Sequence, residues 1–258
     1  MPSPRANPRI RIHCAFEDDA VFVVNKMPGI VSEPGRSHRD DSVLNGLFAL
    51  DDGRLAPRLQ RLGEARDWGL LHRLDRLTSG LLLVALVIEA YDRLREAFET
   101  RAVRKTYLAV VRGELPDAVG EISSPLSEAR AGEQRVSAIA RADDPNARPA
   151  LTRYRTLARS GRYALVECDL VTGRLHQIRV HLASIGAPVA GDPVYDVGGR
   201  ARPQGRRPES AMLCLHAWRL EFAHPLTGAA LAVSAPPPRR FAEFAEAHQL
   251  PVDGHGRE

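Results

Sequence analysis

Residues 72–85 read HRLDRLTSGLLLVA, so a charged tetrapeptide leads through a turn of small residues into an uninterrupted apolar run. The run after Gly80 predicts a buried strand. Asp75 lies shortly before that strand and is flanked by Arg73 and Arg76. A carboxylate between two cations at the start of a buried strand can be held ionised and in one direction. The segment is therefore either a catalytic centre or an ordinary ion pair at the start of a strand.

The composition is typical of a globular protein with a full hydrophobic core. The chain has 258 residues, of which 44% are hydrophobic and 26% charged, and this allows one large domain or two small ones. It contains no apolar run of about 18 residues and begins without an apolar leader, so we expect neither a membrane span nor a secretory signal. The three cysteines, Cys14, Cys168 and Cys214, match no metal-binding or disulfide pattern. These features predict a cytoplasmic protein.

The charge distribution favours a polyanionic partner. The formal net charge is +4, and the isoelectric point is near 9.2. The lysines are Lys26 and Lys105 alone, so nearly all basic side chains are arginines. Arginine forms bidentate contacts with phosphate and stacks on bases, which suits a surface that binds RNA.

A second motif reads TGRLHQIRVHL over residues 172–182. Gly173 permits a sharp turn from a strand into a helix that is expected to start near Arg174. Apolar residues at helical spacing predict a buried stripe formed by Leu175, Ile178, Leu182 and Ile185. Arg174 is then in the first turn, where a carboxylate mounted on a sheet could meet it. His176 and His181 are five residues apart, the wrong spacing for a helical metal pair, so we expect no metal site.

Three segments resemble signatures of the RluA family of RNA pseudouridine synthases: residues 72–81, residues 105–113 (KTYLAVVRG) and residues 173–181 (GRLHQIRVH). The resemblance extends from about Phe16 to about Pro236 and is to the short form without the accessory N-terminal RNA-binding domain. It implies an α+β fold, the pseudouridine synthase fold, with a long, bent, mainly antiparallel sheet, flanking helices and a central RNA-binding cleft.

The pattern along the chain predicts short elements within this fold. Helices are expected at residues 42–50, 89–100 and 239–249, and strands at residues 21–24, 101–113, 150–157 and 162–171. Residues 51–68 show no clear periodicity and are expected to form an irregular connector. A single catalytic domain is predicted at residues 9–249, between flexible tails at residues 1–8 and 250–258.

The resemblance also implies roles for individual residues. Asp75 would be the catalytic carboxylate, Arg174 the basic residue that pairs with it, and Tyr107 the ring that stacks on the target uracil. Arg73 would occupy the place of the uridine base that leaves its stack. Further contacts with the substrate are expected from His72, Arg76, Lys105, His176, Gln177 and Arg179. Contacts with the RNA backbone are expected from an arginine-rich loop that contains Arg200, Arg202, Arg206 and Arg207.

The implied reaction needs no cofactor and no metal. The expected substrate is a uridine in structured RNA, either large-subunit rRNA or the anticodon arm of tRNA, and the protein is expected to be a monomer. Asp75 could attack ribose carbon 1′, attack uracil carbon 6 or act as a base at ribose carbon 2′, and the sequence leaves all three routes open.

Two other functions fit parts of the sequence. A hydrolase of N-glycosidic bonds could also use Asp75, but it would need a second carboxylate or a metal-held water, and the sequence offers no evident partner. A non-catalytic RNA-binding protein would explain the arginine content. It would not require Asp75, Tyr107 and Arg174 together in three matching motifs.

Overall fold

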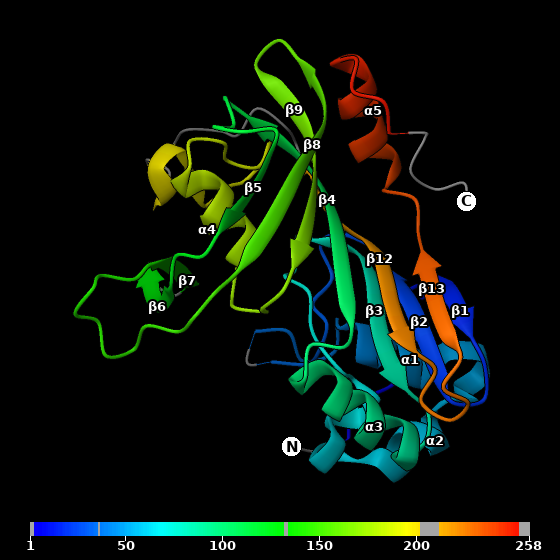
Figure 1. The fold of residues 1–258 in the computed structure, drawn as a ribbon. Coiled ribbons are helices and arrows are strands. Elements are labelled where there is room, and N and C mark those ends of the chain that lie inside the picture. The colour runs from blue at the N-terminus through cyan, green and yellow to red at the C-terminus, as the bar shows by residue number, and fades with distance from the viewer. Residues whose placement is uncertain (1–2, 36, 132–133, 202–211, 253–258) are drawn as a thin grey trace. The chain divides into compact units, whose positions relative to one another are not determined.

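The computed structural model describes residues 3–35, 37–131, 134–201 and 212–252 (Figure 1). Its α-helices are α1 (Val43–Ala49), α2 (Ala56–Leu62), α3 (Ile88–Glu99), α4 (Gln177–Ser184) and α5 (Arg239–Ala247). Short 3₁₀ segments lie at Leu50–Gly53, Glu64–Gly69 and Val197–Gly199. Its strands are β1 (Cys14–Glu17), β2 (Val21–Lys26), β3 (Ser79–Ala85), β4 (Arg104–Arg112), β5 (Val119–Ile122), β6 (Leu126–Ala131), β7 (Gln134–Ile139), β8 (Thr152–Ser160), β9 (Tyr163–Leu170), β10 (Tyr195–Asp196), β11 (Arg200–Ala201), β12 (Leu215–Ala223) and β13 (Ala230–Ser234).

Contacts between residues divide the chain into two compact units. Unit 1 comprises Met1–Arg104 and Ala217–Pro236, and unit 2 comprises Lys105–His216 and Pro237–Glu258. Each unit is thus formed by two segments that are separated in the sequence. The single catalytic domain expected at residues 9–249 stays a prediction.

In unit 1 the strands are ordered β1-β2-β3-β12, and β13 pairs with β12. β2 and β3 are antiparallel, with Val21 opposite Ala85 and Lys26 opposite Gly80. Every residue of β3 is buried, which confirms the strand predicted from the apolar run. The register places Lys26, at the end of β2, beside the start of β3, where the turn that contains Asp75 enters the sheet.

Gly80 allows the close packing of backbone at the start of β3. Its φ is +112°, a conformation that residues with a side chain rarely adopt. A Cβ atom at this position would lie 2.2 Å from the carbonyl oxygen of Ala217. A glycine is therefore required at the point where the turn after Asp75 becomes a strand.

The helices of unit 1 follow the predicted pattern with one exception. Ser42 is the N-cap of α1 and forms a capping box with Asn45, as its position predicted. Helix α3 occupies the predicted range and packs against β3. The exception is α2, because residues 51–68 were wrongly expected to be irregular. This helix has seven residues, with Pro57 in its first turn, and is too short for a helical period to be read from the sequence.

The residues described near both chain ends contact the rest of their units. Asn45 Nδ2 donates a hydrogen bond to Arg5 O at 2.7 Å, and Asn7 N–H donates to Asn45 O at 2.9 Å. Leu250 is buried, and its N–H donates to Ala245 O at 2.9 Å. These contacts hold parts of both predicted tails against the fold.

In unit 2 the strands are ordered β4-β9-β8-β5, and each neighbouring pair is antiparallel. Tyr107 on β4 lies opposite Cys168 on β9. Cys168 is fully buried, which confirms it as a core residue, and this burial raises the pKa of its thiol. β6 and β7 form a separate two-stranded hairpin that leads out of β5 and back toward β8 (Figure 1).

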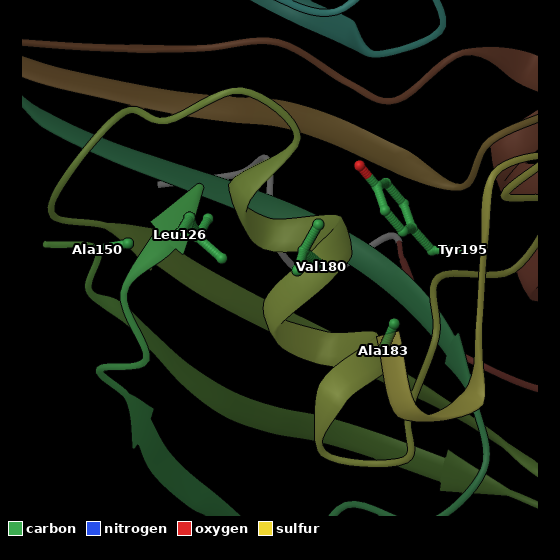
Figure 2. Close-up of a cluster of buried hydrophobic side chains, with 5 residues drawn as sticks. All are labelled: Leu126, Ala150, Val180, Ala183 and Tyr195. Carbon is green, nitrogen blue, oxygen red and sulfur yellow. The ribbon is translucent and has the colours of Figure 1, made fainter. Parts of the chain in front are cut away.

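Helix α4 of unit 2 differs in two ways from its prediction. It begins at Gln177 rather than near Arg174, because His176 adopts a left-handed conformation with φ +52°. It is buried on every residue from Gln177 to Ala183, not only along the predicted apolar stripe. The cause is its position, since α4 packs against β7, β8 and β10. Figure 2 shows Val180 and Ala183 of this helix in a cluster with Leu126, Ala150 and Tyr195.

The fold class matches the prediction. The strand pairs β1–β2, β2–β3, β12–β13, β4–β9, β8–β9, β5–β8 and β6–β7 are all antiparallel, and helices pack against them, which confirms the α+β class. Within the described ranges, no helix is both long enough and apolar enough to cross a membrane. The expected bend of the sheet and the central RNA-binding cleft stay predictions.

Candidate active site

Asp75 lies in a tight turn of unit 1 directly before β3. The turn is closed by a hydrogen bond from Thr78 N–H to Asp75 O at 3.1 Å. Leu74 is buried, Asp75 is half-buried and Arg76 is exposed. The Asp75 side chain is thus carried on a fixed backbone at the border between core and solvent.

The last residue of β2 and the segment between β2 and α1 hold both sides of this turn. Lys26 Nζ donates hydrogen bonds to Met27 O at 3.1 Å, Ile30 O at 2.8 Å and Arg76 O at 3.2 Å. Ser32 Oγ donates to Leu74 O at 3.1 Å and accepts from Leu74 N–H at 3.0 Å. Ser32 was not among the predicted site residues, and Lys26 was considered only for a contact with phosphate or for a role in local structure. The rarity of lysine in this chain was a signal for Lys26, whereas no sequence signal pointed to Ser32.

Lys26 is the most unusual ionisable group near Asp75. Its side chain is only 1% exposed. Burial lowers the pKa of Lys26 to about 7, and the negative charge of Asp75 opposes this effect. The two side chains therefore interact electrostatically in the structure.

His72 and Arg73 precede Asp75 in the sequence and were predicted to contact the substrate, and their surroundings differ. His72 Nε2 accepts a hydrogen bond from Leu83 N–H at 3.1 Å, and its ring stacks on Phe98 with centroids 5.2 Å apart. One nitrogen of this histidine is thus used within the fold. Arg73 forms an exposed ion pair with Glu33, with Nη1 and Oε1 2.7 Å apart. Such an exposed pair is weak and can be exchanged for a ligand.

Tyr107 and Lys105 belong to unit 2 and lie on one face of β4, two residues apart. Tyr107 is largely buried, and Lys105 is half-buried. Burial lowers the pKa of Lys105. Between them, Thr106 Oγ1 donates a hydrogen bond to Asp169 Oδ1 at 3.0 Å, which links β4 to β9.

Arg174, also in unit 2, is exposed in the loop that precedes α4. Its Nε donates to Pro149 O at 3.2 Å. Gln177 holds the loop, because its Oε1 accepts hydrogen bonds from Arg174 N–H at 3.1 Å and from Thr172 Oγ1 at 2.8 Å. Gln177 Nε2 donates to Leu151 O at 3.0 Å. The buried amide of Gln177 thus ties the loop that carries Arg174 to the start of β8.

Arg179 and His176 belong to a polar network behind that loop. Arg179 forms a bidentate ion pair with Asp192, at 2.7 Å and 2.9 Å, and the two side chains are only 3% and 0% exposed. The guanidinium of Arg179 also lies over the ring of Tyr195, 5.2 Å from its centroid. Tyr195 Oη lies 2.9 Å from His176 Nδ1 and accepts from Ser137 N–H at 2.9 Å. In this structure these side chains support the interior beside the Arg174 loop.

The predicted phosphate-binding loop is described only at its start. Arg202, Arg206 and Arg207 lie outside the described residues. Arg200 begins β11, with Asp196 of β10 as its partner in the register. In the ranges that the structure describes, no group of three His, Cys, Asp or Glu side chains is arranged to hold a metal ion.

The site residues are divided between the two units. Asp75, Arg73 and His72 belong to unit 1, whereas Tyr107 and Arg174 belong to unit 2. Each unit by itself fixes the backbone of its own residues by hydrogen bonds from a neighbouring segment. The meeting of Arg174 and Tyr107 with Asp75 stays a prediction.

Comparisons with known proteins identify the family. A family model described as RNA pseudouridylate synthase matches residues 20–184, which include all three motifs. The chain is 37% identical over 242 residues to the ribosomal large subunit pseudouridine synthase D of Nitrosomonas europaea, covering 92% of this chain and 65% of that protein. It is 37% identical over 237 residues to the uncharacterized RNA pseudouridine synthase YlyB of Bacillus subtilis, covering 90% of this chain and 71% of that protein.

A solved structure agrees with these sequence matches. The fold is similar to that of human RNA pseudouridylate synthase domain containing 1, with a TM-score of 0.63 and 26% identity, covering 88% of this chain and 84% of that chain. The chain spans about two thirds of the length of the curated relatives named above. The motif around Asp75, the fold and the sequence matches agree, and the chain belongs to the RNA pseudouridylate synthase family.

Proposed function

We propose that this protein isomerises specific uridines in structured RNA to pseudouridine, with Asp75 as the catalytic carboxylate. The observation that carries the proposal is the family match over residues 20–184 together with the placement of Asp75. Asp75 lies half-buried in a turn whose backbone is held at Leu74 and at Arg76. A reacting carboxylate needs this combination of a fixed direction and access to substrate.

The proposed reaction is balanced without any co-reactant. The bond between uracil N1 and ribose carbon 1′ breaks, the uracil turns, and a bond forms between uracil carbon 5 and ribose carbon 1′. The proton on carbon 5 leaves, and N1 gains a proton. Asp75 attacks ribose carbon 1′, attacks uracil carbon 6 or removes a proton at ribose carbon 2′, and each route uses its ionised form.

Arg174 and Tyr107 complete the proposed site from unit 2. Arg174 pairs with the Asp75 carboxylate, and its guanidinium offers the planar donor geometry that a carboxylate accepts. Tyr107 stacks on the target uracil and assists removal of the proton from carbon 5. His72, Arg73, Arg76, Lys105, His176, Gln177 and Arg179 are proposed as contacts with the bound RNA, directly or by holding these loops.

The proposed substrate is large-subunit rRNA, with the anticodon arm of tRNA as the second candidate. The first choice is supported by the name of the relative from Nitrosomonas europaea, a ribosomal large subunit pseudouridine synthase. The exposed guanidinium of Arg73 suits an RNA that must give up one base from its stack. We further propose that the protein acts as a monomer in the cytoplasm.

The test is release of tritium from transcripts labelled at uracil carbon 5, with large-subunit rRNA, small-subunit rRNA and bulk tRNA compared. Asp75→Asn keeps the size of the side chain and removes its charge, so it should abolish release while RNA binding persists. Asp19→Asn is the matched control, because Asp19 is an exposed carboxylate of the same unit. Asp75→Asn activity within about tenfold of wild type, a difference of only about 1.4 kcal/mol in the barrier, would contradict the assigned role.

The same assay separates the alternatives. Free uracil as the product, in place of pseudouridine, would indicate a hydrolase of N-glycosidic bonds. RNA binding without release from any transcript would indicate a non-catalytic RNA-binding protein. Release by the wild type from one RNA class alone would identify the substrate class.

A further inference from the structure

We propose that Lys26 and Ser32 are positioning residues for Asp75, and that they act by fixing the two peptide groups on either side of it. Together they form a clamp, defined here as Lys26, Ser32 and their hydrogen bonds to Leu74 and Arg76. This inference rests on the proposed role of Asp75 as the catalytic carboxylate.

Ser32 holds the residue before Asp75. Its hydroxyl donates to Leu74 O and accepts from Leu74 N–H, so one side chain satisfies both polar groups of one residue. Ser32 is 3% exposed, and Leu74 is buried. Loss of the hydroxyl in such a buried place would leave polar groups of Leu74 unpaired. The peptide that leads into Asp75 is therefore restrained in position and in direction.

Lys26 holds the residue after Asp75. An ammonium group has three N–H donors, and carbonyl oxygens of Met27, Ile30 and Arg76 accept all three. Arg76 O accepts a second hydrogen bond, from Gly29 N–H at 2.7 Å. Residues 26 and 76 are 50 positions apart, so this contact ties the turn to another part of the chain. The clamp thus holds the turn at both neighbours of Asp75 in the sequence.

Burying an ammonium costs free energy. The three hydrogen bonds of Lys26 to carbonyl oxygens offset part of this cost. The charge of Asp75 offsets a further part, because it favours the protonated form of Lys26 and so raises its pKa against the effect of burial.

The clamp predicts a specific kinetic effect. A displacement of about 1 Å in a reacting group can lower the rate about 100-fold, while the surface that binds the substrate is unchanged. We expect Ser32→Ala and Lys26→Met to lower kcat by about this factor and to leave KM within about twofold of wild type. Ser137→Ala is the matched control, because the Ser137 hydroxyl is buried but has no hydrogen-bond partner in the described part of the chain.

Rescue distinguishes positioning from loss of folding. Ser32→Thr keeps the hydroxyl and should retain most of the kcat that Ser32→Ala loses. Lys26→Ala opens a cavity that added propylamine can enter as an ammonium, so propylamine should restore part of kcat and propanol should not. Propylamine and propanol are compared on the same variant, so the disturbance of packing caused by the substitution is identical in both measurements.

A double-mutant cycle, measured by urea unfolding without any RNA, tests the coupling between Lys26 and Asp75. At about pH 6, below the pKa of Lys26, the loss in urea midpoint caused by Lys26→Met should be smaller in the Asp75→Asn background than in wild type. An inactive wild type would refute the proposed function, while this cycle would still decide the coupling. Equal losses in both backgrounds, a raised KM with unchanged kcat, or no rescue by Ser32→Thr and propylamine would overturn the inference.

Discussion

Replacing Lys26 with methionine should change how the stability of this protein depends on pH. Burial lowers the pKa of Lys26 from its usual value of 10.5 to about 7, against the opposing charge of Asp75. Between these two values the unfolded chain binds a proton that the folded protein lacks. Stability therefore rises with pH in this range and is lost as the pH falls toward 7. Methionine does not titrate, so the variant lacks this dependence.

The magnitude follows from the difference between the two pKa values. The shift from 10.5 to about 7 corresponds to about 5 kcal/mol of differential stability over the full range. Between about pH 6.5 and pH 9, the linkage relation gives an increase of about 2.5 kcal/mol for wild type relative to Lys26→Met. The side chain is 1% exposed, so screening by solvent reduces this value little.

The assay is urea unfolding of both proteins at several pH values and constant ionic strength, followed by circular dichroism. The difference between the two unfolding free energies is plotted against pH, which cancels groups common to both proteins, such as the buried thiol of Cys168. A difference that stays constant within about 0.5 kcal/mol would refute the reasoning, because Lys26 would then carry its proton equally in both states.

The remaining predictions concern packing and a buried charge. Gly80→Ala should destabilise unit 1 by at least about 3 kcal/mol, because its φ is +112° and the new Cβ would lie 2.2 Å from a carbonyl oxygen. Gly228→Ala, at φ +75° but with no atom within 4 Å, should cost only about 1 kcal/mol in the same urea titration, and equal losses would contradict the role of Gly80. Arg179→Met leaves the Asp192 carboxylate buried without its partner and should cost about 3–5 kcal/mol. Arg153→Met removes an exposed ion pair instead and should cost under about 1 kcal/mol by thermal unfolding, so a comparable loss in both variants would refute the argument.

Local sequence patterns were sufficient to predict the features that depend on residues close together in the chain. Ser42 was predicted as the start of α1 because an N-cap acts on the N–H groups next to it in the chain. The strand β3 was predicted because an apolar run of that length can only be buried. Cys168 was predicted as a core residue because its neighbours at alternate positions are apolar, and it is fully buried.

Other predictions were wrong or missing because the contacts that cause these features involve residues remote in the sequence. The left-handed residue His176, which delays the start of α4, lies beside Tyr195 in a network that the sequence pattern does not reveal. The burial of Gln177 depends on two acceptors at the start of β8, Thr152 Oγ1 and Leu151 O, which are 25 and 26 positions away. A helix pattern reports which residues share a face, but it does not report how many faces other elements cover.

The chain alone was enough to predict the principal strands and helices, the position of Asp75 before a buried strand, and the family together with the α+β class that the resemblance implies. Each of these depends on residues close together in the sequence, through periodicity, capping or a contiguous motif. The folded structure was needed to identify the clamp of Lys26 and Ser32, the ion pair of Arg179 with Asp192 and the role of Gln177. These contacts join segments that come together only when the core is packed, and buried polar groups must then find partners wherever the fold provides them.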